Sequence, residues 1–383
     1  MQPEIKRILL IENRADYGMG GVENYNRNLY KILTSNFNDI QIDRVAFLPC
    51  ENINEEKLID KYYHVYKLNS NFRTKSGSYN FFKLAFLFLK FRSLVYKLNK
   101  QNKYDLIIDS TITTFRKFHD FPFYFWIQHS APVFYSMQHI KNKFMRTFII
   151  FFARCFGIKN NLYYAKNLVL FDKYNYQEIK DTRSTPFNAY VINLSNYVPP
   201  HFEKELTNSA NFKKGILYFG RIDNDPKNIN WLHEINQSLH LIDFYGKGDA
   251  NLIAKLGPSY KGFISNSNDF QDLFIKYKFM ILMSNYEGFP FSLTQSLCYG
   301  LPIIVLDTFP SAKYLVNDNQ NGFLLKPHQT LDKYTQTIKQ FYSVNNEEYL
   351  KLSLNAYHFA QANLSDEQFE QKWLKIFHEY LDK

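Results

Sequence analysis

The clearest pattern along the chain is a series of short apolar runs separated by polar or amphipathic segments. One run, Phe279 to Met283, is followed by a polar loop at 284–290 and a second apolar run at Ile303 to Leu306. Between the loop and the second run lies an amphipathic segment, which we expect to form a helix that ends at Gly300. This order predicts a strand–loop–helix–strand unit of a parallel, doubly wound sheet.

Similar apolar runs recur through most of the chain, which predicts an α/β protein throughout. The other strands are expected at Lys6–Ile11, Ile40–Leu48, Tyr62–Leu68, Tyr104–Ser110, Phe123–Ile127, Asn167–Phe171, Tyr190–Leu194, Ile216–Arg221 and Leu241–Tyr245. Pro199, Pro200 and the polar stretch that follows them indicate a linker. A last helix is expected from Asp366 to Leu381, with Ser365 as its cap.

Length and composition suit two globular domains. The chain has 383 residues, of which 45% are hydrophobic, and its three cysteines are far apart. Neither a disulfide framework nor a metal-binding spacing can be built from them, which fits a reducing cytoplasm. We expect no signal peptide, and no apolar stretch reaches the roughly 20 residues that span a bilayer.

A glycine cluster lies between the first expected strand and the first expected helix. Gly20 and Gly21 could bring the backbone close to a phosphate, although a tight turn without a ligand is the ordinary alternative. The dinucleotide-binding fingerprint fails because its third glycine would fall on Glu23. This failure disfavours a hydride-transfer enzyme.

The loop after Phe279 to Met283 is the best place for chemistry, because ligands of such sheets bind beyond the carboxyl ends of the strands. Gly288 allows close approach of the backbone, and Pro290 suits the first turn of a helix whose free amides favour a phosphate. Glu287 beside them could accept hydrogen bonds from hydroxyl groups. The alternative is a carboxylate that only caps the next helix.

The same loop resembles the signature of retaining glycosyltransferases of the GT-B fold, family four. Glu287 stands at the first acidic position, where the family's residue contacts the donor sugar. The residues around it that match the family are Gly288, Phe289, Pro290, Gly300, Pro302 and Ile303. The second acidic position, which contacts the ribose in the family, holds Gln295 instead. A glutamine can still bond a ribose hydroxyl, without the assistance of a charge.

Other segments carry the resemblance through the second half of the chain. Arg221 and Lys227 match a family element whose cations hold the donor diphosphate, as the charge of that group requires. Asp223-Asn224-Asp225 lies in the same loop, and we assign it no metal. Gly246 and Phe263 match, more weakly, segments that contact the rest of the nucleotide. The family also uses the glycines 20–21 near the donor phosphates.

The first domain should supply the acceptor site. The strand segment that begins at Phe125 is expected to end in His129, which corresponds to a histidine that family members place toward the donor sugar. We prefer it to His119, which lies among charged loop residues. A structural role is the ordinary alternative for a lone histidine.

Basic charge is concentrated in the first half of the chain. Residues 71–166 contain 16 basic and three acidic residues, so this segment carries +13 while the whole chain carries +10. The segment Phe81 to Lys100 is expected to form a helix with Lys83, Lys90 and Lys97 on one face and a wide apolar surface. A second basic stripe follows at 139–157. Such helices suit an anionic membrane, or are core helices whose lysines face water.

The resemblance implies two Rossmann-like domains facing across a cleft, at 1–200 for the acceptor and 201–365 for the donor, with 366–383 returning to the first. It implies a metal-independent, retaining sugar transfer from a nucleotide-sugar, expected to be a UDP-sugar, to a free or lipid-linked glycan in polysaccharide or glycoconjugate synthesis. The expected place is the cytoplasmic face of the cell membrane. We expect no cofactor and find no nucleic-acid motif. The alternative is a non-catalytic GT-B subunit that binds a protein or glycan, which Gln295 favours.

Overall fold

The protein is described from a computed structural model. The structure describes residues 6–12, 21–46, 63–67, 81–111, 115–128, 147, 161–162, 164–209, 213–264 and 269–381. The chain divides into two compact units. Unit 1 comprises residues 1–171, 176–192 and 370–383, and unit 2 comprises 172–175 and 193–369.

Unit 1 is built on a parallel sheet of seven strands in the order β3-β2-β1-β4-β5-β6-β7. The strands are β1 (Lys6–Glu12), β2 (Ile40–Ala46), β3 (Tyr63–Lys67), β4 (Leu106–Asp109), β5 (Tyr124–Ile127), β6 (Asn167–Leu170) and β7 (Asn188–Val191). The central strands β4, β5 and β6 are buried along their whole length, as their unbroken apolar sequences require.

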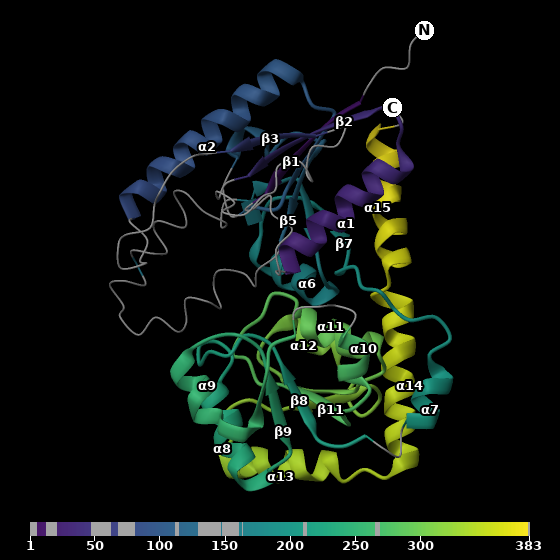
Figure 1. Cartoon of the computed structure of the whole chain (residues 1–383). Helices are drawn as coiled ribbons and strands as arrows, with labels where there is room; N and C mark the ends of the chain where they lie inside the picture. The colour runs from purple at the N-terminus through teal and green to yellow at the C-terminus, as the bar shows by residue number, and fades with distance from the viewer. Residues whose placement is uncertain are drawn as a thin grey trace. The chain divides into compact units, whose positions relative to one another are not determined.

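Helices cover this sheet (Figure 1). They are α1 (Gly21–Asn36), α2 (Phe81–Asn102), the short 3₁₀ helix η2 (Arg116–Phe118), α6 (Lys173–Thr182), whose first residues belong to unit 2, and most of α15 (Asp366–Leu381). The apolar stripe of α2 forms part of the unit 1 core, where Phe91, Val95 and Leu98 are buried. Among the described side chains of α2, the large apolar groups that remain exposed are Phe86 and Leu89.

The helix α15 packs on α1, as expected of a helix that returns to the first domain, and Figure 1 shows the two side by side. The indole Nε1 of Trp373 donates to the hydroxyl of Tyr25 at 3.2 Å, and both side chains are buried. Ser365 caps the start of α15, since its Oγ accepts the amide of Gln368 at 3.3 Å.

Unit 2 contains a parallel sheet of six strands in the order β10-β9-β8-β11-β12-β13. The strands are β8 (Ile216–Phe219), β9 (Ile242–Tyr245), β10 (Tyr260–Gly262), β11 (Phe279–Leu282), β12 (Ile303–Leu306) and β13 (Gly322–Leu325). The helices are α7 (Glu203–Ser209), α8 (Ile229–Leu239), α9 (Ala250–Leu256), η3 (Gly257–Ser259), α10 (Asp269–Phe274), α11 (Phe291–Cys298), α12 (Pro310–Leu315), α13 (Leu331–Tyr342) and α14 (Asn346–Asn363).

The helix α11 ends where the sequence predicts. Gly300 has a φ of +60°, and a Cβ at this position would lie 2.5 Å from the Cδ1 of Leu206 in α7. Its carbonyl accepts the hydroxyl of Ser353 in α14. A glycine is therefore required both for the left-handed turn and for the close packing of α7 and α14 around it.

The strand order of unit 2 reverses between β8 and β11, since β9 and β10 lie on one side of β8 while β12 and β13 lie beyond β11. At such a switch point the loops after the two strands diverge and leave a crevice at their carboxyl ends. Arg221 and Lys227 follow β8, and Glu287 follows β11. The fold therefore brings the two predicted parts of the donor site to the same place.

Candidate functional site

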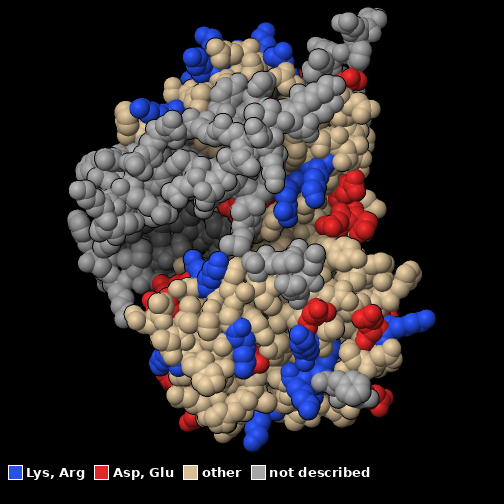
Figure 2. Space-filling model, viewed as in Figure 1, with Lys and Arg blue, Asp and Glu red and all other residues tan. Residues whose placement is uncertain are grey.

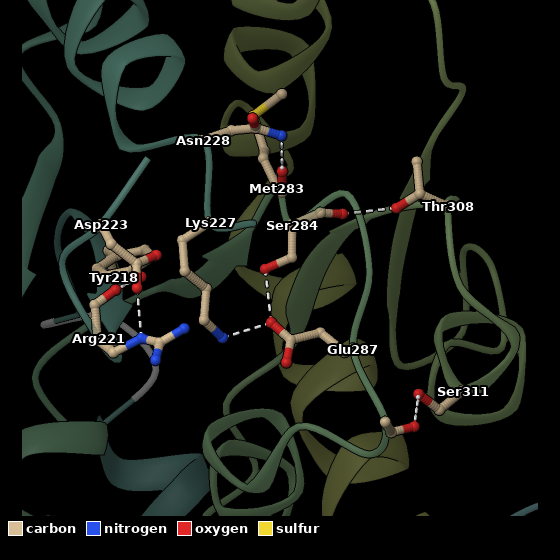
Figure 3. Close-up of polar contacts among 11 residues, drawn as sticks. Tyr218, Arg221, Asp223, Lys227, Asn228, Met283, Ser284, Glu287, Thr308 and Ser311 are labelled. Carbon is tan, nitrogen blue, oxygen red and sulfur yellow. Dashed lines mark hydrogen bonds and ion pairs between the residues drawn. The ribbon is translucent and has the colours of Figure 1, made fainter. Parts of the chain in front are cut away.

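The centre of the site is a contact between Lys227 and Glu287. The Nζ of Lys227 donates to the Oε1 of Glu287, and the Oγ of Ser284 donates to the same oxygen at 2.6 Å (Figure 3). The side chains of Lys227 and Glu287 are 13% and 14% exposed, so the ion pair is only slightly accessible to solvent. Lys227 carries three N–H donors, which leaves it able to bind an additional oxygen.

Asn228 holds the loop after β8 against the loop after β11. Its backbone is in the left-handed region, with a φ of 54°, a conformation that asparagine tolerates better than most residues. Its Nδ2 donates to the carbonyl of Met283 at 2.8 Å, and the amide of Asn285 donates back to the carbonyl of Pro226 at 2.8 Å. These bonds fix the distance between Lys227 and Glu287 through the backbone.

The loop after β12 supports the same region from the other side (Figure 3). Thr308 Oγ1 donates to the carbonyl of Ser284 at 2.6 Å, and Ser311 Oγ donates to the carbonyl of Gly288 at 3.0 Å. The segment that carries Glu287 is thus held by loops from two neighbouring strands, β8 and β12.

Arg221 lies at the exposed side of the site. Its Nε pairs with the Oδ2 of Asp223, and its side chain is 64% exposed. Tyr218 Oη donates to the carbonyl of Arg221 at 2.6 Å and so fixes its backbone. Burial raises the pKa of Asp223, although the charges of Arg221 and Lys227 oppose this rise. Both terminal amino groups of Arg221 lack a partner among the described residues and can bind an anion.

The helix α11 begins one residue later than expected. Pro290 has a ψ of 110° and precedes the helix as its N-cap residue instead of lying in the first turn. No side chain caps α11, because the carboxylate of Glu287 accepts from Lys227 and Ser284 instead. The amides of Phe291 and Ser292 have no carbonyl within the helix to bind. The helix-cap alternative for Glu287 is therefore wrong, and this end of α11 remains suited to a phosphate.

Two of the other predicted residues of unit 2 adjoin α11. Phe289 is buried against Tyr314, with 6.0 Å between the ring centroids. Gln295 lies one helical turn after Phe291, and its Oε1 is buried without a hydrogen-bond partner among the described residues. An unpaired buried carbonyl oxygen costs stability, and a hydroxyl donor from a ligand would satisfy it.

The two weaker matches, Gly246 and Phe263, lie after β9 and β10. A Cβ on Gly246 would lie 1.8 Å from the carbonyl oxygen of Gly220, so the glycine allows the loops after β8 and β9 to cross closely. This packing explains the glycine without a ligand. Phe263 is partly exposed, and the Nζ of Lys247 lies 4.0 Å from the centroid of its ring.

The predicted residues of unit 1 are less completely described. Gly21 is the first residue of α1, whereas Gly20 and His129 lie outside the described residues. His119, which the sequence placed among charged loop residues, is only 5% exposed, and its Nε2 lies 3.0 Å from the Oδ1 of Asn161. Burial lowers the pKa of His119.

The sequence did not single out the residues that position the site: Ser284, Asn228, Asn285 and Thr308. One signal was present, because asparagine is suited to a left-handed turn. No group of three or more histidine, cysteine, aspartate or glutamate side chains in the described parts of the chain could hold a metal ion.

A family model matches part of the second half of the chain. Residues 248–359 match the family described as glycosyl transferases group 1, and this segment contains Glu287 and Gln295. The match covers less than half of the chain and places a segment similar to the group 1 glycosyltransferases in unit 2. Arg221 and Lys227 precede the matched segment but lie in the same unit as it.

Curated relatives match over part of their length. A GtfA subunit of UDP-N-acetylglucosamine–peptide N-acetylglucosaminyltransferase from Limosilactobacillus reuteri is 28% identical over 45% of this chain and 33% of its own. An α-1,4-N-acetyl-D-galactosaminyltransferase of Campylobacter jejuni, which by its name acts on an undecaprenol-linked glycan, is 26% identical over 47% of this chain and 53% of its own. The matches thus cover about half or less of these relatives.

Solved glycosyltransferase structures show that the chain has the GT-B fold. Sucrose-phosphate synthase from Thermosynechococcus elongatus has a TM-score of 0.74 at 16% identity, covering 98% of this chain and 99% of its own. WaaG, a glycosyltransferase of lipopolysaccharide biosynthesis, has a TM-score of 0.67 at 13% identity, covering 97% and 99%. At these identities the likeness establishes the fold alone.

Proposed function

We propose that the protein is a retaining glycosyltransferase that moves a sugar from a UDP-sugar to a glycan acceptor. The observation that carries the proposal is the geometry at the β8–β11 switch point. There, the Lys227–Glu287 pair, the free terminal amino groups of Arg221 and the unpaired Oε1 of Gln295 occur in the unit that contains the segment similar to group 1 glycosyltransferases. The cations suit the diphosphate of a nucleotide-sugar, and the acceptor oxygens suit its hydroxyl groups.

The donor would bind along unit 2. Arg221, Lys227 and the free amides at the start of α11 suit the diphosphate, where charge is greatest. Glu287, beside Lys227, suits hydroxyls of the donor sugar, and Gln295 suits a hydroxyl of the ribose. The remaining donor-side residues are Gly246 and Phe263 toward the base, Gly288, Phe289 and Pro290 around the sugar and phosphate, and Gly20 and Gly21 from the first domain.

In the proposed reaction the bond between the anomeric carbon and the diphosphate oxygen breaks, and the diphosphate leaves with the electron pair. The acceptor hydroxyl attacks the anomeric carbon from the same face, and the departing phosphate oxygen takes its proton. No strong protein base is then needed. The protein contributes mainly electrostatic stabilisation, from Arg221, Lys227 and the α11 amides, of the charge that develops on the leaving group.

Uridine as the base is supported by the names of related proteins. The Limosilactobacillus relative is named for UDP-N-acetylglucosamine, and one protein of similar structure, HepE from Anabaena, was solved with UDP-glucose. We propose that residues 1–200 provide the acceptor site, with His129 facing the donor sugar, and that residues 201–365 bind the donor.

For the acceptor we propose a lipid-linked glycan at the anionic cytoplasmic face of the cell membrane. The Campylobacter relative is named for an acceptor of that kind. The helix α2 exposes Phe86 and Leu89, 59% and 51% accessible, together with Lys90 and Lys97. Figure 2 shows further basic side chains gathered at the top of the view, where α2 ends in Figure 1. No helix in the described residues is long and apolar enough to cross a membrane.

A thermal-shift panel of UDP-, GDP- and ADP-sugars tests the donor assignment, because a ligand that binds only the folded state raises the melting temperature. The UDP-sugars should give the largest rise, and Lys227→Ala should reduce it. A rise in melting temperature with GDP- or ADP-sugars alone would show that the donor base is guanine or adenine instead of uracil. Binding of no nucleotide-sugar would contradict the proposal and favour a non-catalytic subunit.

A further inference from the structure

A cavity of about 710 Å³, lined by both polar and apolar groups, opens on unit 1. The residues of its wall that bear on its chemistry are Arg116, His119, Asp120, Tyr164, Lys166 and Arg183. These residues precede β5, β6 and β7, so the cavity lies at the amino ends of these strands. Ligands of the main site in such a sheet bind at the opposite, carboxyl edge. The cavity is therefore distinct from that edge.

The wall of the cavity is held by internal hydrogen bonds. The guanidinium of Arg183, which is 8% exposed, donates to the carbonyl oxygens of Leu162 at 3.0 Å and Ala165 at 2.8 Å and to Thr185 Oγ1 at 2.8 Å. The amide of Lys166 donates to the carbonyl of His119 at 3.0 Å. The segments before β5, β6 and β7 are thus joined, and the cavity keeps its shape without a ligand.

One aromatic ring stands at the opening. Tyr164 is 56% exposed and stacks on the buried His119, with 6.3 Å between the ring centroids and 19° between the planes. The histidine holds one face of the tyrosine ring and leaves the other toward solvent. A flat exposed ring of this kind suits the apolar C–H face of a sugar, while the phenol and neighbouring polar groups bind hydroxyls.

The charged groups around the ring select for an anion. Arg116 and Lys166 are exposed and form no ion pair with any residue that the structure describes, while Asp120 offers an acceptor for hydroxyl groups. Two free cations and one carboxylate favour a ligand that carries both an acidic group and hydroxyls. Arg183 does not serve this purpose, because carbonyl oxygens already occupy its donors.

We propose that this cavity is a second saccharide site, which binds an acidic sugar with its ring on Tyr164 and its acid group on Arg116 and Lys166. The site would hold part of a charged glycan at the amino ends of β5, β6 and β7. The inference rests on unit 1 alone and holds or fails independently of the donor assignment.

Ligand-observed NMR titration tests the proposal with three probes: a disaccharide of glucuronic acid and glucose, its neutral counterpart cellobiose, and inorganic phosphate. The acidic disaccharide should bind at least about tenfold more tightly than the other two. Equal binding of cellobiose would overturn the role of charge. Equal binding of phosphate that Arg116→Ala abolishes would overturn the role of the ring, and no binding of the acidic disaccharide would overturn the ligand class.

Variants test the location. Arg116→Ala, Lys166→Ala and Tyr164→Ala change exposed side chains, and each should raise the Kd of the acidic disaccharide about tenfold. Lys117→Ala, next to Arg116 but outside the cavity wall, and Tyr197→Ala, with a ring 63% exposed, are the matched controls and should leave it unchanged. Unchanged binding in the three cavity variants would refute the site.

Discussion

Lys227 and Glu287, 60 residues apart in the sequence, share a hydrogen bond between the Nζ of one and the Oε1 of the other. Because Ser284 donates to the same oxygen, the carboxylate is held on two sides and points into the crevice instead of toward α11. A donor diphosphate would find Lys227 already in place. Preorganised charge of this kind costs no rearrangement when the leaving group becomes negative.

Removing either proposed phosphate-binding cation should slow the reaction greatly. We expect Arg221→Ala or Lys227→Ala to lower kcat by a factor of about 10²–10³, because charge on the leaving diphosphate would lack compensation in the transition state. Steady-state kinetics with the best UDP-sugar measures the effect. Circular dichroism checks the fold, and Lys255→Ala, which changes an exposed lysine of α9, is the control. Near-native kcat in both variants would rule out the proposed site.

Gln295 should contribute to donor affinity through a neutral hydrogen bond. Gln295→Ala should weaken donor binding by about 1 kcal/mol, and Gln295→Glu should bind at least as well as the native protein because a charged acceptor is stronger. Isothermal titration with the donor measures both, with Gln237→Ala on an exposed face of α8 as the control. Weaker binding by the glutamate variant would mean that the ribose does not contact this position.

The exposed side of α2 should bind anionic membranes. Changing Lys83, Lys90 and Lys97 together to Glu should release the protein from anionic liposomes and leave donor binding intact, since each basic residue near such a surface contributes roughly 1 kcal/mol. Co-sedimentation at low and high salt is the measurement. Phe86→Ser with Leu89→Ser tests the apolar part, and Lys333→Glu with Lys339→Glu in α13 is the control. A native protein that ignores anionic liposomes at low salt would disprove the membrane contact.

Lys213 should make unit 2 less stable at neutral pH than at alkaline pH. Its side chain is 6% exposed, and its Nζ has no hydrogen-bond partner among the described residues and lies 5.8 Å from the ring centroid of Tyr349. Burial lowers the pKa of Lys213 to about 8, from 10.5. The unfolded chain therefore holds more protons between these two values, and the free energy of unfolding should rise with pH across that window.

Lys213→Met should remove this rise and stabilise the protein at pH 7, where the cost of the buried charge is fully present, by up to about 3 kcal/mol. Urea unfolding at pH 7 and at alkaline pH measures both effects. Lys214→Met, at the exposed neighbouring position, should change neither. If the two variants behave alike, the Lys213 ammonium is not desolvated in the folded state.

Much of the fold could be predicted because local patterns determine it. The apolar runs expected at Phe279–Met283 and Ile303–Leu306 contain the fully buried strands β11, Phe279–Leu282, and β12, and Gly300 lies just beyond the helix between them. Boundaries were less exact: the strand expected at Tyr190–Leu194 is β7, Asn188–Val191. Edge strands carry weaker apolar patterns, because only part of their surface is buried.

The tertiary contacts could not be predicted from local sequence patterns. Nothing within a few residues of Lys227 indicates that Glu287 is its partner or that Asn228 ties the two loops together, because the strand order of the sheet creates these contacts. In the same way, the pattern of α2 cannot tell a core face from a membrane face. The structure buries Phe91 and Val95 and leaves Phe86 outside. The role of His129 stays a prediction.

The return of α15 to unit 1 has a consequence for synthesis on the ribosome. Trp373 packs its buried indole on Tyr25, so this part of the first unit is completed only after residues 370–383 have left the exit tunnel. Unit 2 has all its strands by then and can fold earlier. The usual order, in which the N-terminal domain folds first during translation, is therefore reversed for the final step in this chain.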